Sequence, residues 1–156
     1  MDKIDIEILK YLRRDSRGSL GKIADMMGIS KATVSRRISK MEASNIITGY
    51  TVITNKSKMG VMRALILMNI SGTSLNRVVE EMRSFKEIEF IHKLFGDHSI
   101  MCEVYVATVD DLYQLIQDHI LKIPGIQNVE VDILIDRIEM NLDAEFNIVP
   151  DFTPSS

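Results

Sequence analysis

The feature that most constrains the fold is segment 19–44, which has the pattern of two short helices joined by a tight turn. Ser19 and Ser30 are suited to cap the two helices, and Gly28 stands where a left-handed residue would end the first one. Each helix carries an apolar stripe at helical spacing, made by Leu20, Ile23, Ala24 and Met27 in the first and by Val34, Ile38 and Met41 in the second. The segment therefore predicts a helix-turn-helix.

The free surface of the second helix is polar and basic, which is typical of a helix that enters the major groove of DNA. We expect base-edge contacts from Thr33, Ser35, Arg36 and Ser39, and phosphate contacts from Lys31, Arg37 and Lys40. Arg37 points toward the edge of the buried stripe, so its partner is either a phosphate or a neighbouring carboxylate. The alternative interpretation of the whole segment is an ordinary helical hairpin with a solvated basic face.

The charge of the chain is divided unevenly between its two parts. The whole chain has a net charge of −3, which by itself argues weakly against nucleic acid as a partner. Residues 1–60 hold twelve Lys/Arg and six Asp/Glu, a balance of +6, whereas the remainder holds seven and sixteen, a balance of −9. Basic charge is therefore concentrated around the predicted helix-turn-helix, where phosphates would be neutralised. The acidic part is expected to face away from DNA.

The pattern along the chain predicts an α+β protein of two domains. Residues 1–54 are expected to form a three-helix, winged-type helix-turn-helix domain, in which the first helix covers about 2–14 and residues 46–53 are extended. A polar linker follows at 55–61, and a second domain at 62–140. Residues 141–156, with two prolines and a terminal Ser-Ser, are expected to be an irregular tail.

The second domain has the order βαββαβ, which predicts a ferredoxin-like fold. The expected strands and helices cover 62–70, 75–82, 88–95, 100–106, 110–121 and 129–135. Two helices cover only one face of a four-stranded sheet, yet alternation places seven apolar residues on the other face: Leu65, Leu67, Ile91, Phe95, Met101, Tyr105 and Leu134. We expect that face to be buried against a second copy of the chain, which predicts a homodimer.

Other functions are less well supported by the sequence. An enzyme would have to be built from scattered candidates, which are His92, Asp97, His98, Glu103 and His119, with His92 and Glu103 expected on opposite faces of the sheet. No paired-histidine metal spacing, phosphate-binding glycine loop or nucleophile elbow is present, so we expect no catalysis, no metal and no cofactor. A metabolite-sensing assembly module with little DNA role is the remaining alternative.

Two further features bear on the environment of the chain. No apolar run approaches the length of a membrane span, and the N-terminus lacks the pattern of a secretory signal, so we expect a cytoplasmic protein without a membrane partner. The single cysteine, Cys102, lies in an apolar strand-like run. We expect it to be a small core residue and not a reactive thiol.

From Ile4 to about Ile138 the chain resembles the leucine-responsive regulatory protein/asparagine regulator (Lrp/AsnC) family. The resemblance is carried by the order and spacing of IDIEIL, GISKATVSRRISKME, NIITGYTVI, LFGDHS and IPGIQNV. It implies a transcription regulator that binds a palindromic operator on double-stranded DNA. It also implies a homodimer that can assemble further into a tetramer or octamer. The second domain would bind a small effector, usually an amino acid, at subunit interfaces.

The resemblance places this effector at the turn formed by Gly96, Asp97, His98 and Ser99. Main-chain N–H groups at such a turn can hold an α-carboxylate, and Asp97 can pair with an α-ammonium group. The family commonly has Gly-Asp-Tyr-Asp here, so this chain replaces the second carboxylate with the hydroxyl of Ser99. That departure predicts weaker binding of a simple amino acid or a different ligand. The alternative is that Gly96 and Asp97 only form a hairpin turn.

Overall fold

The computed structural model describes residues 1–149, which form two compact units. The helical unit consists of Met1–Ile53 together with the segment that begins at Glu139, and the sheet unit consists of Thr54–Ile138. The chain therefore passes between the units twice. The predicted linker at 55–61 contains a short 3-10 turn, η1 (Ser57–Met59), and the first strand begins at the predicted residue, Met62.

The helical unit contains the three predicted helices, α1 (Lys3–Arg14), α2 (Leu20–Met27) and α3 (Lys31–Ala43). Ser19 and Ser30 each accept a hydrogen bond from the main-chain N–H three residues later, as the sequence predicts. Gly28 has φ 64° and ψ 32°, a left-handed conformation that only glycine adopts at little cost. Local sequence therefore fixes both the ends of the helices and the turn between them.

The core of the helical unit joins the three helices through five buried side chains, Ile8, Ile23, Ala24, Val34 and Met41. Burial of a large aliphatic side chain contributes about 1.5–3 kcal/mol, so these residues hold α3 firmly against α1 and α2. After α3 the described chain contains no strand between residues 44 and 54. The Tyr50 hydroxyl instead donates to a carboxylate oxygen of Glu42 at 2.9 Å, which ties this extended segment to α3.

The C-terminal segment differs from the predicted irregular tail, because it forms a short helix, α6 (Ala144–Asn147), that packs on α1. The guanidinium of Arg13 donates to the main-chain carbonyl of Leu142 and to the carboxylate of Glu145, and it lies 4.7 Å from the centre of the Phe146 ring. Arg14 forms an ion pair with Asp143. Charge complementarity between α1 and this acidic segment explains the difference.

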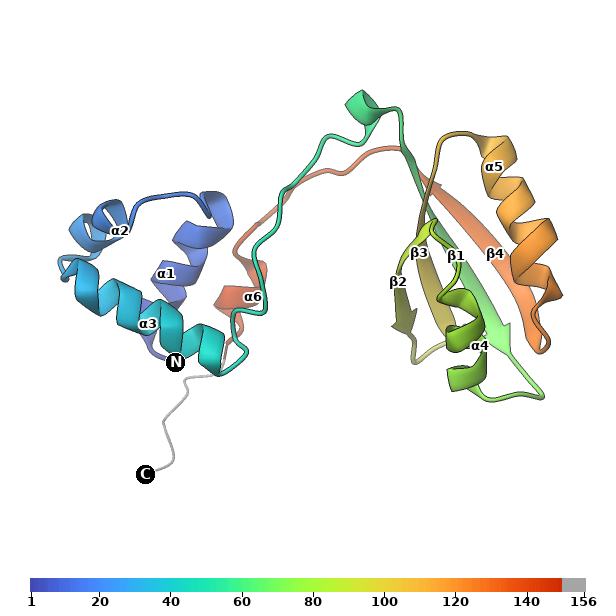
Figure 1. The fold of residues 1–156 in the computed structure, drawn as a ribbon, viewed down its shortest axis with the longest axis horizontal. Helices are drawn as coiled ribbons and strands as arrows, with labels where there is room; N and C mark the ends of the chain where they lie inside the picture. Colours follow the sequence, from blue (N-terminus) through green and yellow to red (C-terminus); the bar gives the residue numbers. More distant parts are fainter. Residues whose placement is uncertain (150–156) are drawn as a thin grey trace. The chain divides into compact units, whose positions relative to one another are not determined.

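The sheet unit is the predicted ferredoxin-like βαββαβ fold, with strand order β2-β3-β1-β4 and antiparallel pairing throughout. Both α4 and α5 lie on the same side of the sheet (Figure 1). The six elements are β1 (Met62–Ile70), α4 (Leu75–Met82), β2 (Ile88–Lys93), β3 (Ile100–Val106), α5 (Val109–Gln114) and β4 (Ile126–Leu134).

The expected helix at 110–121 is interrupted after α5. A π-helical turn, η2 (Leu115–His119), and a 3-10 turn, η3 (Ile120–Lys122), follow it. Leu115 and Ile120 are five residues apart and both are buried, whereas a regular α-helix would turn them about 140° away from each other. The wider π turn brings both side chains into the same core.

The two faces of the sheet are largely as predicted, with two corrections. Ile91 lies opposite Cys102 in the register and packs against the helix-covered core, so its assignment to the open face is wrong. A bulge between Ile88 and Phe90 shifts the alternation, and Phe90, opposite Glu103, takes the open-face position. Phe95 lies beyond the end of β2 and is fully exposed, so it is not part of the sheet face.

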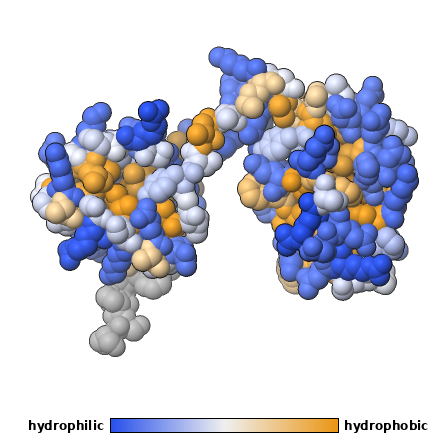
Figure 2. Space-filling model, in the orientation of Figure 1, coloured by the Kyte–Doolittle hydropathy of each residue, from blue (hydrophilic) through white to orange (hydrophobic). Residues whose placement is uncertain are grey.

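The open face also carries a polar cluster. Glu103 contacts Arg63 at 2.7 Å and accepts a hydrogen bond from the Tyr105 hydroxyl at 3.0 Å. Burial and the neighbouring carboxylates Glu89 and Glu103 raise the pKa of Tyr105 to about 12. Figure 2 shows hydrophobic residues, in orange, interspersed with hydrophilic ones, in blue, on the visible surface of each unit. The open face thus combines an apolar patch with a fixed polar cluster.

Candidate nucleic-acid interface and effector pocket

The outer surface of α3 presents most of the predicted DNA-contacting residues to solvent. Lys31, Ser35, Arg36, Ser39 and Lys40 are exposed. Within residues 1–149 the side chains of Ser35, Arg36, Ser39 and Lys40 form no hydrogen bond or ion pair with another residue. Their donors are therefore available for base edges and phosphates.

In the first turn of α3, the side chain of Thr33 takes part in the N-terminal cap of the helix. The hydroxyl of Thr33 lies 2.9 Å from that of Ser30, within the N-terminal cap, so Thr33 has less freedom to contact a base than its position suggests. The Lys31 side chain lies close to Gly21 of α2. A Cβ atom added at Gly21 would lie 3.0 Å from the Cε atom of Lys31. The start of α3 is therefore held against α2.

Arg37 differs from the other predicted contacts because it binds two carboxylates of the protein. Its Nη1 atom donates to an oxygen of Asp2 and to one of Asp5, both at 2.8 Å. The hydrogen bond from the main-chain N–H of Asp5, and after it the hydrogen bond from Arg37, lower the pKa of Asp2, and the carboxylates of Asp5 and Asp2 raise the pKa of Arg37. Of the two partners that the sequence allows, the structure shows the carboxylate. The assignment of Arg37 to phosphate is corrected accordingly.

The charge of the helical unit differs from that of the N-terminal sequence. Residues 1–53 and 139–149 together contain ten Lys/Arg and nine Asp/Glu, a balance of +1. The acidic residues of the C-terminal segment account for part of this change, and Asp143 and Glu145 neutralise Arg14 and Arg13 directly. Among residues 1–53 the lysines and arginines without an ion pair in the described chain are Lys3, Arg17, Lys22, Lys31, Arg36 and Lys40, of which the last three lie on α3, whereas Arg13 and Arg14 at the end of α1 are both paired.

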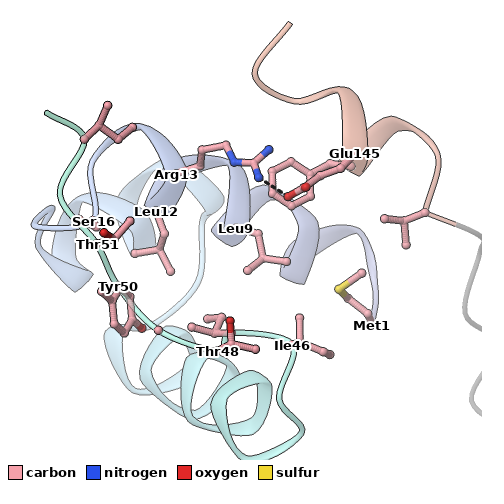
Figure 3. Close-up of a pocket in the computed structure, with 15 residues that line it drawn as sticks. Met1, Leu9, Leu12, Arg13, Ser16, Ile46, Thr48, Tyr50, Thr51 and Glu145 are labelled. Carbon is pink, nitrogen blue, oxygen red and sulfur yellow. Dashed lines mark hydrogen bonds and ion pairs between the residues drawn. The ribbon is translucent and has the colours of Figure 1, made fainter. Parts of the chain in front are cut away.

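A cavity of about 590 Å³ lies in the helical unit between α1, the segment after α3, and α6 (Figure 3). Its walls are mainly apolar and include Leu9, Leu12, Ile46 and Phe146. The charged residues that line it, Arg13 and Glu145, are paired with each other. The cavity therefore offers no free charge that would select a ligand.

A second cavity, of about 650 Å³, lies in the sheet unit beside the predicted effector turn. Three of the four predicted residues line it, namely Gly96, His98 and Ser99. Asp97 is exposed and is not part of the lining. The other lining residues come from the loop before α4, from the start of α4 and from the ends of β1 and β2: Ile70, Thr73, Leu75, Lys93, Leu94 and Phe95.

Sequence reasoning missed Lys93 and Thr73 as members of this pocket. The Ser-Gly-Thr-Ser run indicates a loop and a helix cap, but it does not indicate that the loop faces the end of β2. The pairing of β1 with β3 and of β3 with β2 brings them together. Contacts between strands distant in sequence therefore build the site.

Gly125 fixes the loop that carries Thr73. Its φ is 92°, and a Cβ atom there would lie 2.6 Å from the carbonyl oxygen of Ser71. The main-chain N–H of Ser71 donates to the carbonyl of Gly125 at 2.8 Å. The Pro-Gly turn before β4 therefore supports one wall of the pocket.

The residues considered for an enzyme do not form a catalytic group. His92 lies opposite Met101, which places it on the same face as Glu103, so the expectation of opposite faces is wrong. The centre of the His119 ring lies 5.4 Å from that of the Phe85 ring in a tilted arrangement, whereas His98 Nε2 lies 3.5 Å from a Glu130 oxygen. Across residues 1–149, no cluster of three or more His, Cys, Asp or Glu side chains has the arrangement of a metal site. None of the helices in the same range has both the length and the apolar character needed to cross a membrane.

Comparison with protein families gives one match for each half of the chain. The profile described as "Winged helix-turn-helix DNA-binding" matches residues 1–48. The profile described as "Lrp/AsnC ligand binding domain" matches residues 63–142. The second match begins at β1 and extends beyond β4 to the segment before α6.

Curated proteins and solved structures with similar chains are transcription regulators. The "HTH-type transcriptional regulator LrpA" of Pyrococcus abyssi is 32% identical over 142 residues, which cover 89% of this chain and 99% of that protein. The structure of Escherichia coli AsnC superposes with a TM-score of 0.82 at 24% identity, covering 92% and 98% of the two chains. The transcriptional regulator NMB0573 of Neisseria meningitidis, solved as a complex with L-Met, also gives 0.82, at 18% identity, with coverage of 92% and 95%. At these identities the two solved structures establish the fold alone.

Proposed function

The chain belongs to the Lrp/AsnC family of transcription regulators, and on this premise we propose that it reads a palindromic operator as a homodimer whose assembly or DNA affinity responds to a small amino-acid-like effector. It is a helix-turn-helix DNA-binding regulator, and its family consists of regulators and not of enzymes. Proteins of this family are oligomeric. A cytoplasmic location agrees with such a function and is part of the proposal.

The observation that carries the proposed DNA contact is the free polar surface of α3. Arg36 lies nearly opposite the buried Val34 on the helix, and both Arg36 and Lys40 are exposed. A guanidinium can donate two hydrogen bonds to one guanine, whereas an ammonium acts as a point charge toward phosphate. We assign Arg36, with Ser35 and Ser39, to base edges and Lys31 and Lys40 to phosphates. Thr33 is a secondary candidate.

A comparison of two charge-removing variants tests this assignment. Arg36→Ala should weaken binding to a selected operator by about 1–3 kcal/mol while leaving non-specific binding much less affected. Lys40→Ala should weaken both kinds of binding alike and lower the salt slope by about one unit. Operators selected from a random DNA pool and titrated at several salt concentrations give both values. If neither variant changes any DNA complex, α3 is not the recognition helix.

The homodimer is supported by the open face of the sheet. Leu65, Leu67, Met101 and Tyr105 line it, and within the sheet unit both α4 and α5 cover the opposite face. Apolar surface of this kind is normally buried against a partner, and a two-fold dimer buries the same patch on both copies. Two recognition helices in such a dimer would read half-sites about one helical turn apart, roughly 10 base pairs.

Effector binding is supported by the cavity beside the Gly96–Ser99 turn. Its volume of about 650 Å³ suits a small ligand, and its lining combines an apolar wall with a few polar groups. The complex of the Neisseria regulator with L-Met is a precedent in a protein of the same fold. Selection of DNA with and without an amino-acid mixture measures the coupling between the two sites. No change in affinity or in assembly would contradict the sensor function.

A further inference from the structure

We propose that the pocket beside the Gly96–Ser99 turn selects a small carboxylate with an aliphatic body and no α-ammonium group, an aliphatic 2-oxo acid being the best fit. This inference rests on the proposed effector function and specifies the ligand that the site prefers. Three properties of the pocket support this inference: its unpaired charges, the hydrogen bonds already made by the Ser99 hydroxyl group, and the apolar character of its wall.

The free charge of the pocket is positive. Lys93 lies at the end of β2 and is exposed, and it forms no ion pair within the described chain. None of the residues that line the cavity is an aspartate or a glutamate. Glu130 lies 3.5 Å from His98, but it is not in the lining, and neither is Asp97. Within this subunit, an ammonium group in the pocket would lose water without gaining a carboxylate partner from the lining.

Main-chain groups add to this preference for an anion. Gly96 and His98 line the pocket, and within residues 1–149 their N–H groups donate to no acceptor of the protein. Leu75, which also lines the pocket, is the first residue of α4, so the positive end of that helix dipole lies at the cavity. A carboxylate can accept from these N–H groups and pair with the Lys93 ammonium.

The hydroxyl group of Ser99, which stands where the family commonly has a second carboxylate, already forms hydrogen bonds within the protein. Ser99 Oγ accepts a hydrogen bond from the main-chain N–H of Ile70 at 3.2 Å and lies 3.5 Å from Asn69 Oδ1. The main-chain N–H of Ser99 donates to the carbonyl of Met68. Ser99 therefore closes the end of β1 and is poorly placed to receive an α-ammonium group.

The rest of the lining is apolar and fits an aliphatic body. Ile70, Leu75, Leu94 and Phe95 form this wall, and Leu94 and Phe95 are exposed in the free protein. Covering such side chains contributes about 25 cal/mol for each Å² of apolar surface removed from water. A hydrophobic carboxylate would use both parts of the pocket, whereas a zwitterion would bring a charge that finds no counterpart.

Binding of matched ligand pairs to the full-length chain tests the inference. Each pair shares its side chain and differs only at the α-carbon: leucine with 4-methyl-2-oxopentanoate, methionine with 4-methylthio-2-oxobutanoate, and valine with 3-methyl-2-oxobutanoate. Isothermal titration should show at least fivefold tighter binding of the 2-oxo acid in the pair that binds best. Tighter binding of the amino acid overturns the inference and leaves the effector function intact. If no ligand of any pair binds, both fail.

Two variants locate the binding groups. Lys93→Met should weaken binding of the 2-oxo acid at least tenfold, because it removes the charge that pairs with the carboxylate. Lys86→Met removes an exposed lysine that does not line this pocket and is the matched control, with an expected change under twofold. Asp97→Asn should also leave binding within twofold. Loss of amino-acid binding in Asp97→Asn, with binding of the 2-oxo acid unchanged, would show that an ammonium group is recognised and would overturn the inference.

Discussion

Arg36 and Arg37 are adjacent on α3 but have different surroundings: Arg36 is free to contact DNA, whereas Arg37 forms ion pairs within the protein. Arg36 points to solvent from the middle of α3, whereas Arg37, turned by 100°, reaches the carboxylates of Asp2 and Asp5 on α1. The sequence places Arg37 at the edge of the buried stripe. Its partners lie more than 30 residues away, so only the packing of α1 on α3 identifies them.

Arg37→Met should lower the free energy of unfolding by about 1–3 kcal/mol, because Asp5 and part of Asp2 would lose a charged hydrogen-bond donor. The pKa of Asp2 is lowered in the folded state, so its contribution is complete above the unfolded pKa of about 3.9 and is lost as the pH falls through the folded value. Urea unfolding at pH 7 and at pH 3 should show a smaller acid-induced loss in the variant than in the wild type.

The matched control for this prediction is Arg36→Met. It should leave the urea midpoint unchanged and reduce operator affinity, whereas Arg37→Met should leave the salt slope of DNA binding unchanged. A salt slope that falls by about one unit in Arg37→Met would instead identify a phosphate contact.

Cys102 should be chemically inert in the folded protein. Its side chain is fully buried, and burial raises the pKa of the thiol to about 12, so very little thiolate is present at pH 8. A thiol-reactive dye should label less than a tenth of the protein under native conditions in the time that labels all of it in denaturant. Fast labelling of the native protein would contradict the described packing of β3 against the helices.

At the scale of elements, local patterns predict most helices and strands, and the errors occur where distant contacts decide. The caps at Ser19 and Ser30, the turn at Gly28 and the alternation in β3 are all readable from neighbouring residues. The bulge in β2, which turns Ile91 inward, depends on pairing with β3. Likewise, α6 has only four residues and little helical pattern of its own, and its packing on α1 positions it.

Removing the acidic partners of α1 should loosen α6. The double variant Asp143→Asn and Glu145→Gln leaves the guanidinium groups of Arg13 and Arg14 without their charged partners. We expect a loss of about 0.5–2 kcal/mol in the unfolding of the helical unit, since Asp143 is mostly buried and Glu145 is mostly exposed.

A control with the same change of charge separates this contact from the overall charge. Glu7→Gln with Asp25→Asn removes two carboxylates from the surface of α1 and α2 without touching α6, and it should change stability by less than 0.5 kcal/mol. Thermal unfolding of both double variants measures the difference. Equal losses in the two would show that the ion pairs with α6 contribute nothing specific.

At the scale of the whole molecule, the composition alone indicates a basic part and an acidic part, but folding redistributes the charge. The acidic segment that begins at Glu139 joins the helical unit and lowers its balance from the +4 of residues 1–53 to +1, while Lys56 and Lys58 belong to the sheet unit. This segment of the acidic part therefore packs on α1 of the DNA-reading unit, and its facing away from DNA stays a prediction. Within residues 1–149, Lys31, Arg36 and Lys40 on α3 remain unpaired, whereas the arginines at the end of α1 are neutralised.

The proposed homodimer should depend on the open face of the sheet. Leu67→Asp places a charge within the apolar patch and should convert a dimer into a monomer in sedimentation velocity at micromolar concentration. Affinity for a full operator should fall far more than affinity for a half-site. Tyr113→Asp, at an exposed position on α5, is the control and should keep the dimer mass. A dimer that survives Leu67→Asp would contradict this interface.

The packing of α6 on α1 also sets an order in which the protein can be completed during translation. The ribosome adds about 100 residues between the end of α3 at Ala43 and the start of α6 at Ala144, including the whole sheet unit. Throughout that interval Arg13 and Arg14 have no acidic partner, and the cavity wall formed by Phe146 is missing. The first helices to be synthesised are therefore the last to reach their final packing, and a nascent chain acquires its finished DNA-reading unit only after its sheet has been made.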